Sequence, residues 1–166
     1  MKWLTLVVFL EMLMIGLSVW LIGFTELRVR EGMMRQVKLE RLHGDIVHLD
    51  EVLTMSAKMS ASSGDLHWEE RYLTFESELA EKIQEVIDES QQLNINLNDL
   101  GISTTNDANS RLVTMEKQAF EFVRNQQPEK AREMLFSSEY DENKKLYAAG
   151  LEKLLDRLDL LVGTLI

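Results

Sequence analysis

The sequence predicts an all-α protein: an antiparallel up-down-up-down four-helix bundle held on a membrane anchor. Three observations predict this fold class. The chain of 166 residues has one proline and eight glycines, fewer turn-forming residues than a β-sandwich of this size normally needs. Apolar residues recur at steps of three and four along four segments, which is the period of amphipathic helices. A long apolar run precedes these segments at the amino terminus.

The amino-terminal run extends from Trp3 to Phe24 and is interrupted only by Glu11. As a helix it would be roughly 33 Å long, enough to cross the hydrocarbon core of a bilayer. A cleaved signal peptide is the alternative, but its apolar stretch would be shorter and a small-x-small cleavage site would follow it. Thr25-Glu26-Leu27-Arg28 follows instead. We therefore expect residues 1–27 to form an uncleaved transmembrane anchor.

Each of the four bundle helices is predicted from one apolar stripe. We expect the first helix to continue from the anchor, because only Gly32 interrupts residues 25–60. Each stripe would face the interior of the bundle. The stripes are, in chain order, Leu42, Ile46, Leu49, Leu53, Ser56 and Ser60; Trp68, Tyr72, Phe75, Leu79, Val86 and Leu93; Ala108, Leu112, Met115, Ala119 and Phe122; and Tyr140, Lys144, Tyr147, Leu151, Leu154, Leu158 and Leu165.

Turn-forming residues separate the stripes. Ser62-Ser63-Gly64-Asp65 is predicted to end the first helix, and Asn125-Gln126-Gln127-Pro128 to end the third. A stretch rich in asparagine, residues 94–105, separates the second helix from the third. Short connections imply that consecutive helices are antiparallel neighbours, which gives the up-down-up-down order.

The last part of the chain completes the bundle. A short extra helix is predicted at residues 129–136, and Ser137 or Ser138 can cap the last long helix. Residues 28–157 then form the bundle. The apolar tail, residues 158–166, is too short to cross a bilayer. We interpret it as an apolar helix end or as the start of a second transmembrane helix.

Composition excludes several classes of function. The formal net charge of −10 makes the chain a poor partner for nucleic acid, since phosphate binding needs clustered lysine and arginine. Cysteine is absent, so disulfides, thiol catalysis and thiolate zinc sites are excluded. No nucleophile–base pairing, glycine-rich phosphate loop or zincin motif occurs. We expect a protein that is not an enzyme and that needs no cofactor.

Polar residues lie on or beside the stripes at one level of the predicted bundle. Lys144 takes a position on the last stripe where a leucine would be expected. Three carboxylates each follow a stripe member by four residues, which places them at the edge of the core face: Asp50, Glu76 and Glu116. Helix rise brings all four groups into one layer, roughly 15 Å below the end of the bundle that is far from the membrane.

Two interpretations of this polar layer are open. The carboxylates could face water, with the lysine extending past two tyrosines to solvent. Alternatively, the layer lines a ligand pocket between the helices, a common location for sites in bundles. Three carboxylates against one lysine favour a cationic or amine-bearing ligand, or a hard metal ion. Four aromatic residues in the same half could present their faces to a cation: Trp68, Tyr72, Tyr140 and Tyr147.

Metal binding through histidine is less favoured. Glu40 and His43 have the Glu-x-x-His spacing of di-iron bundles, but no second such pair lies on another helix. His43 and His48 are separated by roughly 140° around the helix, so they do not converge on one ion. His67 lies at a loop end. We expect solvated histidines and name no metal ligand.

Three segments resemble an amino-terminal helical sensory region of bacterial transmembrane histidine kinases and diguanylate cyclases. They are LDEVLTMSAKMSASSGDLHWEERY (49–72), NSRLVTMEKQAFEFV (109–123) and LFSSEYDENKKLYAAG (135–150), and the resemblance covers residues 40–155. It implies a module outside the cytoplasmic membrane, with its amino terminus in the cytoplasm. It also implies a cytoplasmic output domain after a second crossing in the natural context, which these 166 residues do not contain.

The resemblance also marks individual positions. Glu51 is one of them, but it points about 170° away from the stripe, so we do not expect it to bind a ligand. Ser56 is another and lies on the stripe itself. Together with the polar layer, the resemblance gives these candidate ligand-binding residues: Asp50, Thr54, Trp68, Arg71, Tyr72, Glu76, Asn109, Glu116, Tyr140, Lys144 and Tyr147.

The expected function is that of an extracytoplasmic, ligand-sensing module of a bacterial transmembrane signalling protein. It would sit in the inner (cytoplasmic) membrane with its bundle in the periplasm, and we expect a homodimer joined through the anchor and first helix. A small molecule or ion would bind between the helices and shift the last helix relative to the first. Two alternatives are a membrane-anchored protein–protein interaction module with a dry core, and a metal-binding helical bundle.

Overall fold

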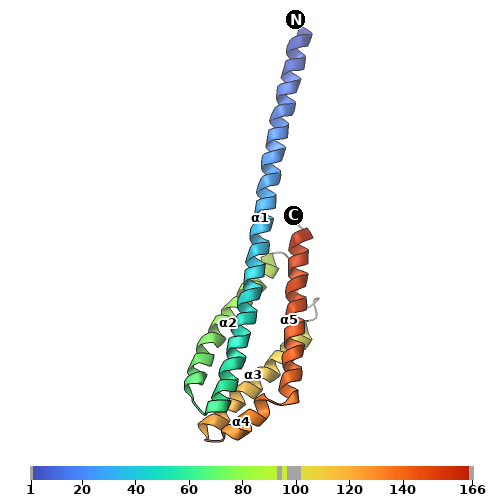
Figure 1. Cartoon of the computed structure of the whole chain (residues 1–166). Helices are drawn as coiled ribbons and strands as arrows, with labels where there is room; N and C mark the ends of the chain where they lie inside the picture. Colours follow the sequence, from blue (N-terminus) through green and yellow to red (C-terminus); the bar gives the residue numbers. More distant parts are fainter. Residues whose placement is uncertain (1, 93–94, 97–101, 165–166) are drawn as a thin grey trace.

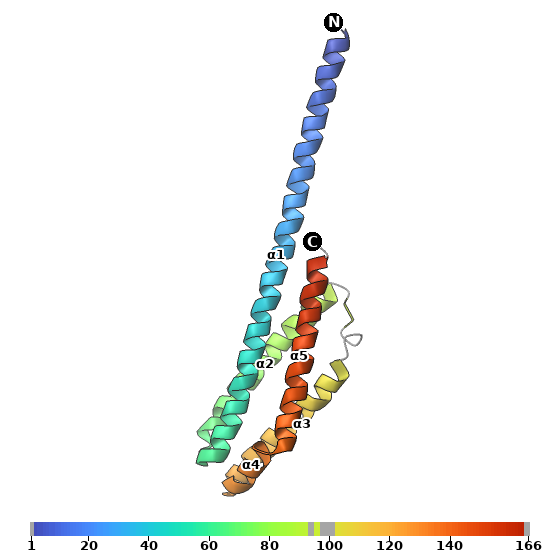
Figure 2. The same cartoon turned by 45° about the vertical axis from the view of Figure 1, so that its right-hand side comes forward.

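The computed structural model describes residues 2–92, 95–96 and 102–164, and within them the protein is an all-helical bundle. This confirms the predicted all-α class. Figure 1 shows a very long first helix whose second half lies alongside the other helices, and Figure 2 shows the same arrangement from a second direction. The helices are α1 (Lys2–Ser63), α2 (His67–Gln92), α3 (Ile102–Arg124), α4 (Pro128–Leu135) and α5 (Ser138–Thr164).

Helix α1 organises the bundle. It contacts α2, α3, α4 and α5, while α3 also contacts α4 and α5. Helix α4 lies across the end of the bundle that is farthest from the amino terminus, and α5 then runs back beside α1 (Figures 1 and 2). The carboxyl end of α5 therefore lies on the side of the bundle from which the first part of α1 emerges.

The turn between α1 and α2 forms at the predicted place. Gly64 has a φ of 73°, in the left-handed region that glycine adopts without steric cost, and its N–H donates to the Ser60 carbonyl over 2.8 Å. The Asp65 carboxylate then accepts the N–H of His67 at the start of α2, over 2.8 Å. These two contacts satisfy backbone groups that the helix ends leave without partners.

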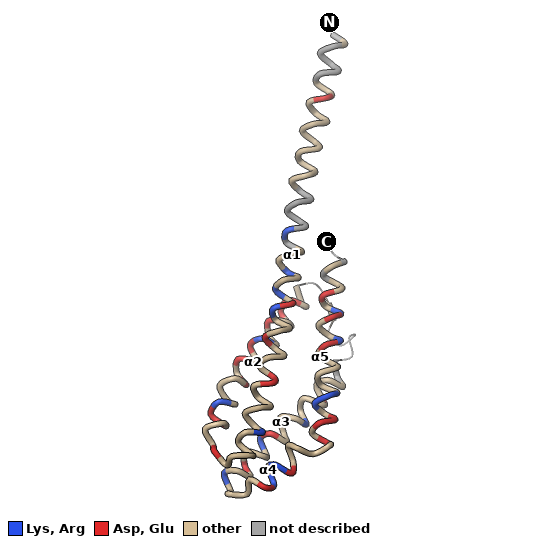
Figure 3. Tube along the Cα trace, viewed as in Figure 1, with Lys and Arg blue, Asp and Glu red and all other residues tan. Residues whose placement is uncertain are grey.

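The amino-terminal part of α1 extends beyond the bundle and exposes its apolar side chains. Figure 3 shows charged residues throughout the bundle, whereas Glu11 is the one charged residue within 9–23. Among the described residues, which leave out several side chains of α1 (those of 2, 4–8, 24–29 and 31), no helix is long and apolar enough to cross a membrane. The large apolar side chains exposed on this part are Trp3, Phe9, Leu10, Met12, Leu13, Met14, Ile15, Leu17, Val19, Trp20, Leu21 and Ile22.

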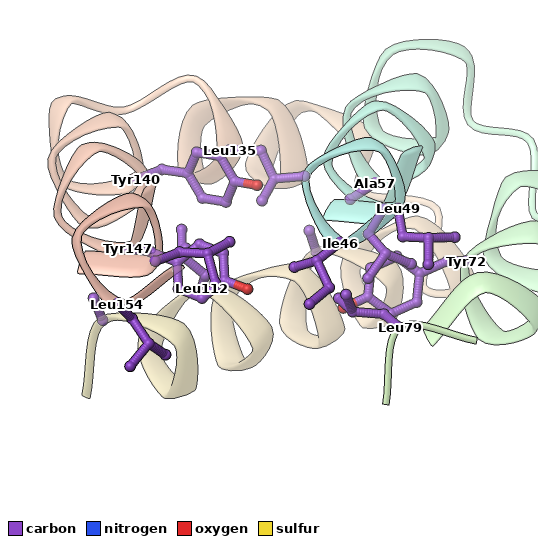
Figure 4. Close-up of a cluster of buried hydrophobic side chains, with 14 of the residues drawn as sticks. Ile46, Leu49, Ala57, Tyr72, Leu79, Leu112, Leu135, Tyr140, Tyr147 and Leu154 are labelled. Carbon is purple, nitrogen blue, oxygen red and sulfur yellow. The ribbon is translucent and has the colours of Figure 1, made fainter. Parts of the chain in front are cut away.

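The predicted stripes supply most of the core. All six members of the first stripe are buried, and so are the apolar members of the last stripe up to Leu158. Figure 4 shows side chains of α1, α2, α3, α4 and α5 converging, including Ile46 of α1, Tyr72 of α2 and Leu112 of α3. Leu93 and Leu165 lie outside the described residues. Three stripe members are half-buried and pack against the core: Phe75, Met115 and Phe122. Trp68 and Lys144 are half-buried as well.

Two predicted boundaries need correction. Helix α3 begins at Ile102, so the prediction that the break extends through Thr105 is wrong. Thr105 is buried against Gly150 of α5, and this contact outweighs the weak helix propensity of its threonine- and serine-rich first turn. Helix α4 begins one residue earlier than predicted, because Pro128 occupies a first-turn position where its missing N–H is not needed.

The predicted cap of the last long helix is confirmed at Ser137. Its hydroxyl accepts the backbone N–H of Tyr140 over 3.1 Å. This fixes the start of α5, and with it the position of the Tyr140 side chain inside the bundle, where the ring is fully buried. The cap therefore positions one of the candidate site residues.

Candidate ligand-binding site

A buried carboxylate lies where α2, α3 and α5 meet. Glu116 of α3 is only 5% exposed. The Tyr72 hydroxyl of α2 donates to its Oε2 over 2.7 Å, and the Tyr140 hydroxyl of α5 donates to its Oε1 over 2.5 Å. The prediction that Glu116 lies at the edge of the core is therefore wrong. Two hydroxyl donors satisfy the carboxylate inside the core, where burial without partners would be costly.

A second polar contact joins α5 to α1. The Lys144 ammonium donates to Asp50 Oδ2 over 2.5 Å and to Thr54 Oγ1 over 2.6 Å. The Lys144 and Asp50 side chains are only 17% and 16% exposed, so the lysine turns inward and does not extend past the tyrosines to solvent. The Tyr140 hydroxyl lies 3.5 Å from Thr54 Oγ1, which connects this contact to the Glu116 cluster. Four helices thus share one polar network.

Burial controls the protonation of this network. Burial raises the pKa of the Glu116 carboxyl, while the hydrogen bonds from Tyr140 and Tyr72 oppose the rise. Burial also raises the pKa of Asp50, and the neighbouring Lys144 opposes it. The pKa values of Tyr72 and Tyr140 are raised far above the usual tyrosine range, first by burial and then by Glu116. Both hydroxyls therefore stay protonated and act as donors at physiological pH.

A pocket of about 150 Å³ opens beside this network, between α1, α2 and α3. Three of its lining residues are carboxylates, and no lysine, arginine or histidine lines it. Its other polar groups are the Tyr72 hydroxyl and the Asn109 amide, and its remaining wall is aliphatic. The lining residues are Asp50, Leu53, Tyr72, Glu76, Leu79, Ala80, Ile83, Asn109, Leu112, Val113 and Glu116.

No family model, curated protein or solved structure matches the chain. The polar network and the pocket beside it are therefore the features from which a function can be proposed.

Most of the candidate residues meet in these two features. Six of them form the network: Asp50, Thr54, Tyr72, Glu116, Tyr140 and Lys144. Glu76 and Asn109 join the site as pocket-lining residues, and Tyr147 is buried on α5. Burial, then the charges of Asp50 and Glu116, raises the pKa of Tyr147.

Two candidate residues at the start of α2 belong neither to the network nor to the pocket lining. The Arg71 guanidinium lies 5.6 Å from the centre of the Trp68 ring and 5.5 Å from that of Phe75. Neither Arg71 nor Trp68 lines the pocket. Both are half-buried near the start of α2. Their stacking stabilises that part of the helix, so including them among the ligand-binding residues is not supported by the geometry.

Sequence reasoning missed two partners of the site. Lys117 forms an ion pair with Glu76 over 2.9 Å, and this contact joins α3 to α2. Glu51 is exposed, as its angle on the helix indicated, yet its carboxylate lies 3.6 Å from the Lys144 ammonium. Both ion pairs link different helices, so they cannot be predicted from an i,i+4 spacing within one helix. The length of the lysine side chain, which can reach past its own helix face, was the available signal.

The histidines do not assemble a metal site. No group of three or more histidine, aspartate or glutamate side chains is placed to hold a metal ion within the part of the chain that the structure describes. His43 lines a second pocket, of about 220 Å³, between α1 and α5. Its lining residues are Gln36, Leu39, Glu40, His43, Leu155, Asp156 and Asp159.

The raised pKa of Glu116 predicts a pH-dependent stability. A folded-state pKa above the unfolded value means that the folded protein holds more protons, so the free energy of unfolding falls as pH rises through that interval. This pH range begins at the ordinary pKa of a glutamate, 4.5, and extends upward to the raised pKa of Glu116. Glu116→Gln should remove this fall and raise stability at mildly alkaline pH, by about 1.4 kcal/mol for each unit of pKa shift.

Urea denaturation of the full chain across this pH range measures the effect. Glu121→Gln is the matched control, since it changes the same residue type at an exposed position of α3 and should keep the wild-type pH slope. The pKa of Asp50 is also raised. In Glu116→Gln the free energy of unfolding should therefore still fall as pH rises, but less steeply than in wild type. Identical slopes for wild type and Glu116→Gln would show that Glu116 ionises normally in the folded state.

Proposed function

We propose that this protein is an extracytoplasmic sensory module of a bacterial transmembrane signalling protein, and that it binds a small amine-bearing cation between α1, α2 and α3. One observation carries the proposal. Three carboxylates, and no basic side chain, line a pocket inside the bundle. Asp50 and Glu76 also pair with Lys144 and Lys117, which do not line the pocket. The carboxylates that line it still favour a positively charged occupant, because an ammonium supplies both charge and hydrogen-bond donors to them.

The pocket also limits the size and shape of the ligand. A cavity of about 150 Å³ is large enough for a molecule the size of benzene. Its wall combines carboxylates with aliphatic side chains such as Leu53, Leu79 and Ile83. A short alkylamine satisfies both parts, since its ammonium can bind the carboxylates while its hydrocarbon is removed from water. A bare divalent ion could bind the carboxylates but would bury no hydrocarbon against the aliphatic wall.

The proposed anchor and topology account for the long first helix. The part of α1 outside the bundle exposes large apolar side chains between residues 9 and 22, which supports insertion into a bilayer. An antiparallel up-down-up-down bundle would then place the ligand pocket away from the membrane and return α5 towards it. The resemblance to sensory regions of histidine kinases and diguanylate cyclases supports an amino terminus in the cytoplasm, a periplasmic bundle and a signalling role without enzymatic activity.

The proposed homodimer would use the face of α1 opposite the core. Met33, Val37, Val47 and Met55 are exposed by 60, 62, 42 and 45%. At 100° per residue these four side chains lie within about 80° of one another, roughly opposite the buried stripe. The exposed carboxylates Glu40 and Glu51 lie on the same face. Pairing of two α1 helices along it would cover the four apolar side chains.

Thermal unfolding of the full chain in detergent micelles tests ligand binding, with n-butylammonium chloride as the probe. At about 100 times its dissociation constant, the probe should stabilise the protein by about 2.7 kcal/mol. That corresponds to a Tm increase of roughly 5–10 °C for a protein of this size. Butyrate, which has a similar shape and the opposite charge, should give no increase.

Three variants locate the binding site. Asp50→Asn and Glu116→Gln should each reduce the stabilisation by n-butylammonium, because each removes a pocket carboxylate. Glu89→Gln is the matched control: Glu89 is a buried carboxylate, 4% exposed, but it pairs with Lys38 over 2.6 Å and does not line the pocket. Equal stabilisation of all three variants and wild type would place the amine elsewhere, and the proposed site would be wrong.

A further inference from the structure

The Lys144–Asp50 pair already places an ammonium group beside the proposed ligand site. Lys144 has three oxygen partners on α1: Asp50 at 2.5 Å, Thr54 at 2.6 Å and Glu51 at 3.6 Å. Of these three, only Asp50 also lines the pocket between α1, α2 and α3. One carboxylate therefore faces the pocket and at the same time holds α5 against α1.

The three partners of Lys144 differ in exposure. Asp50 and Thr54 are largely buried, whereas the Glu51 side chain is 67% exposed and lies one residue along α1. The Lys144 ammonium therefore has an inward position, on Asp50 and Thr54, and a second acceptor on the solvent side. Moving between them exchanges one carboxylate for another, so the lysine keeps a counter-ion in both positions.

We infer that Lys144 is a tethered competitor of the cationic ligand: a bound amine takes its place on Asp50, Lys144 moves outward to Glu51, and α5 shifts relative to α1. This inference rests on the proposed function, because it requires an amine in the pocket. Two ammonium groups on one partly buried carboxylate repel each other, so occupation of the pocket destabilises the inward position. Small shifts of packed helices of this kind are a known means of signal transmission.

The inference predicts that Lys144 weakens binding of the probe. Lys144→Met removes the competing ammonium and keeps an unbranched apolar side chain of similar length. The full chain carrying this substitution should bind n-butylammonium on the order of tenfold to a hundredfold more tightly than wild type, the equivalent of one charge-assisted hydrogen bond. Lys144→Arg keeps the charge and should bind about as weakly as wild type. Titration by isothermal calorimetry in detergent micelles measures all three affinities.

A distance measurement tests the helix shift without changing Lys144. The chain has no cysteine, so cysteines introduced at His48 of α1 and Glu152 of α5, both exposed, are the only sites for nitroxide labels. Saturating n-butylammonium should change the distribution of label distances in the otherwise wild-type chain. Lys144→Met should show the changed distribution without the probe, since α5 has already lost its contact with Asp50.

The results separate this inference from the proposed function. If wild type binds n-butylammonium in a manner that Asp50→Asn weakens, but neither the label distances nor the affinity of Lys144→Met differ from wild type, the site stands and the competitor role is wrong. If neither wild type nor Lys144→Met binds the probe, both proposals are wrong. If Lys144→Met does not fold, the label distances of the wild-type chain decide: bound probe without any shift overturns the inference.

Discussion

Removing both tyrosine hydroxyls from the buried network, in Tyr72→Phe/Tyr140→Phe, is expected to lower the free energy of unfolding by about 3–5 kcal/mol at neutral pH. These hydroxyls donate to the two oxygens of Glu116, which is 5% exposed. Without them a buried carboxylate has lost both donors, and its desolvation is no longer offset. Urea denaturation measures the loss. The loss should be smaller at acidic pH, where the Glu116 carboxyl is protonated and needs no charge compensation.

Two further variants show whether the loss comes from the carboxylate. Adding Glu116→Leu to the double variant should recover most of the stability, because no polar group is then left without a partner. Tyr147→Phe is the matched control, since it removes the hydroxyl of another buried tyrosine of α5 and keeps both donors to Glu116. If the double variant loses no more than Tyr147→Phe, the network contributes little to the fold and the proposed role of Glu116 is wrong.

Replacing Gly150 with alanine is expected to destabilise the protein by about 1–3 kcal/mol, although alanine in a helix interior normally stabilises by up to about 1 kcal/mol. The new Cβ would lie 2.0 Å from Oγ1 and 2.9 Å from Cβ of Thr105. Rotation of the threonine can move Oγ1, but its Cβ is fixed to the backbone. Helices α3 and α5 would therefore have to separate. Thermal unfolding of the full chain measures the change in Tm.

Gly44→Ala is the control for this prediction. Nothing lies within 4 Å of a Cβ built at Gly44, which is also inside a helix, so alanine there should stabilise by about 0.5–1 kcal/mol. Adding Thr105→Gly to Gly150→Ala removes the three threonine atoms that would crowd the new Cβ, so part of the lost stability should return. The recovery should be incomplete, because glycine has a lower helix propensity than threonine. Equal stability of Gly150→Ala and Gly44→Ala would show that α3 and α5 do not approach each other so closely.

Periodicity predicted the elements and most of the core. The stripe from Leu42 to Ser60 is buried throughout, and the turn at Gly64 and the cap at Ser137 lie where the sequence placed them. These features depend on local rules: the angle between residues on a helix, and the backbone conformations that glycine and serine favour. Local rules apply to each segment before the helices pack together.

How deeply the site residues are buried could not be predicted in the same way. Spacing placed Glu116 at an edge because it follows Leu112 by four residues, but the buried face of α3 includes Glu116 together with Leu112 and Ala119. The two tyrosine donors that make this burial possible come from other helices. Likewise, the Glu76–Lys117 pair and the contact of Thr105 with Gly150 depend on how two helices meet. A single sequence contains no local signal for these contacts.

The most direct test of the central claim, that the pocket beside Asp50, Glu76 and Glu116 binds an amine, is a crystal structure of the full chain with n-butylammonium. We expect the ammonium nitrogen within hydrogen-bond distance of at least one of these carboxylates, with the alkyl chain against the aliphatic wall of the pocket. An amine bound only in the pocket between α1 and α5 beside His43, with the pocket beside Asp50 free of it, would contradict the account.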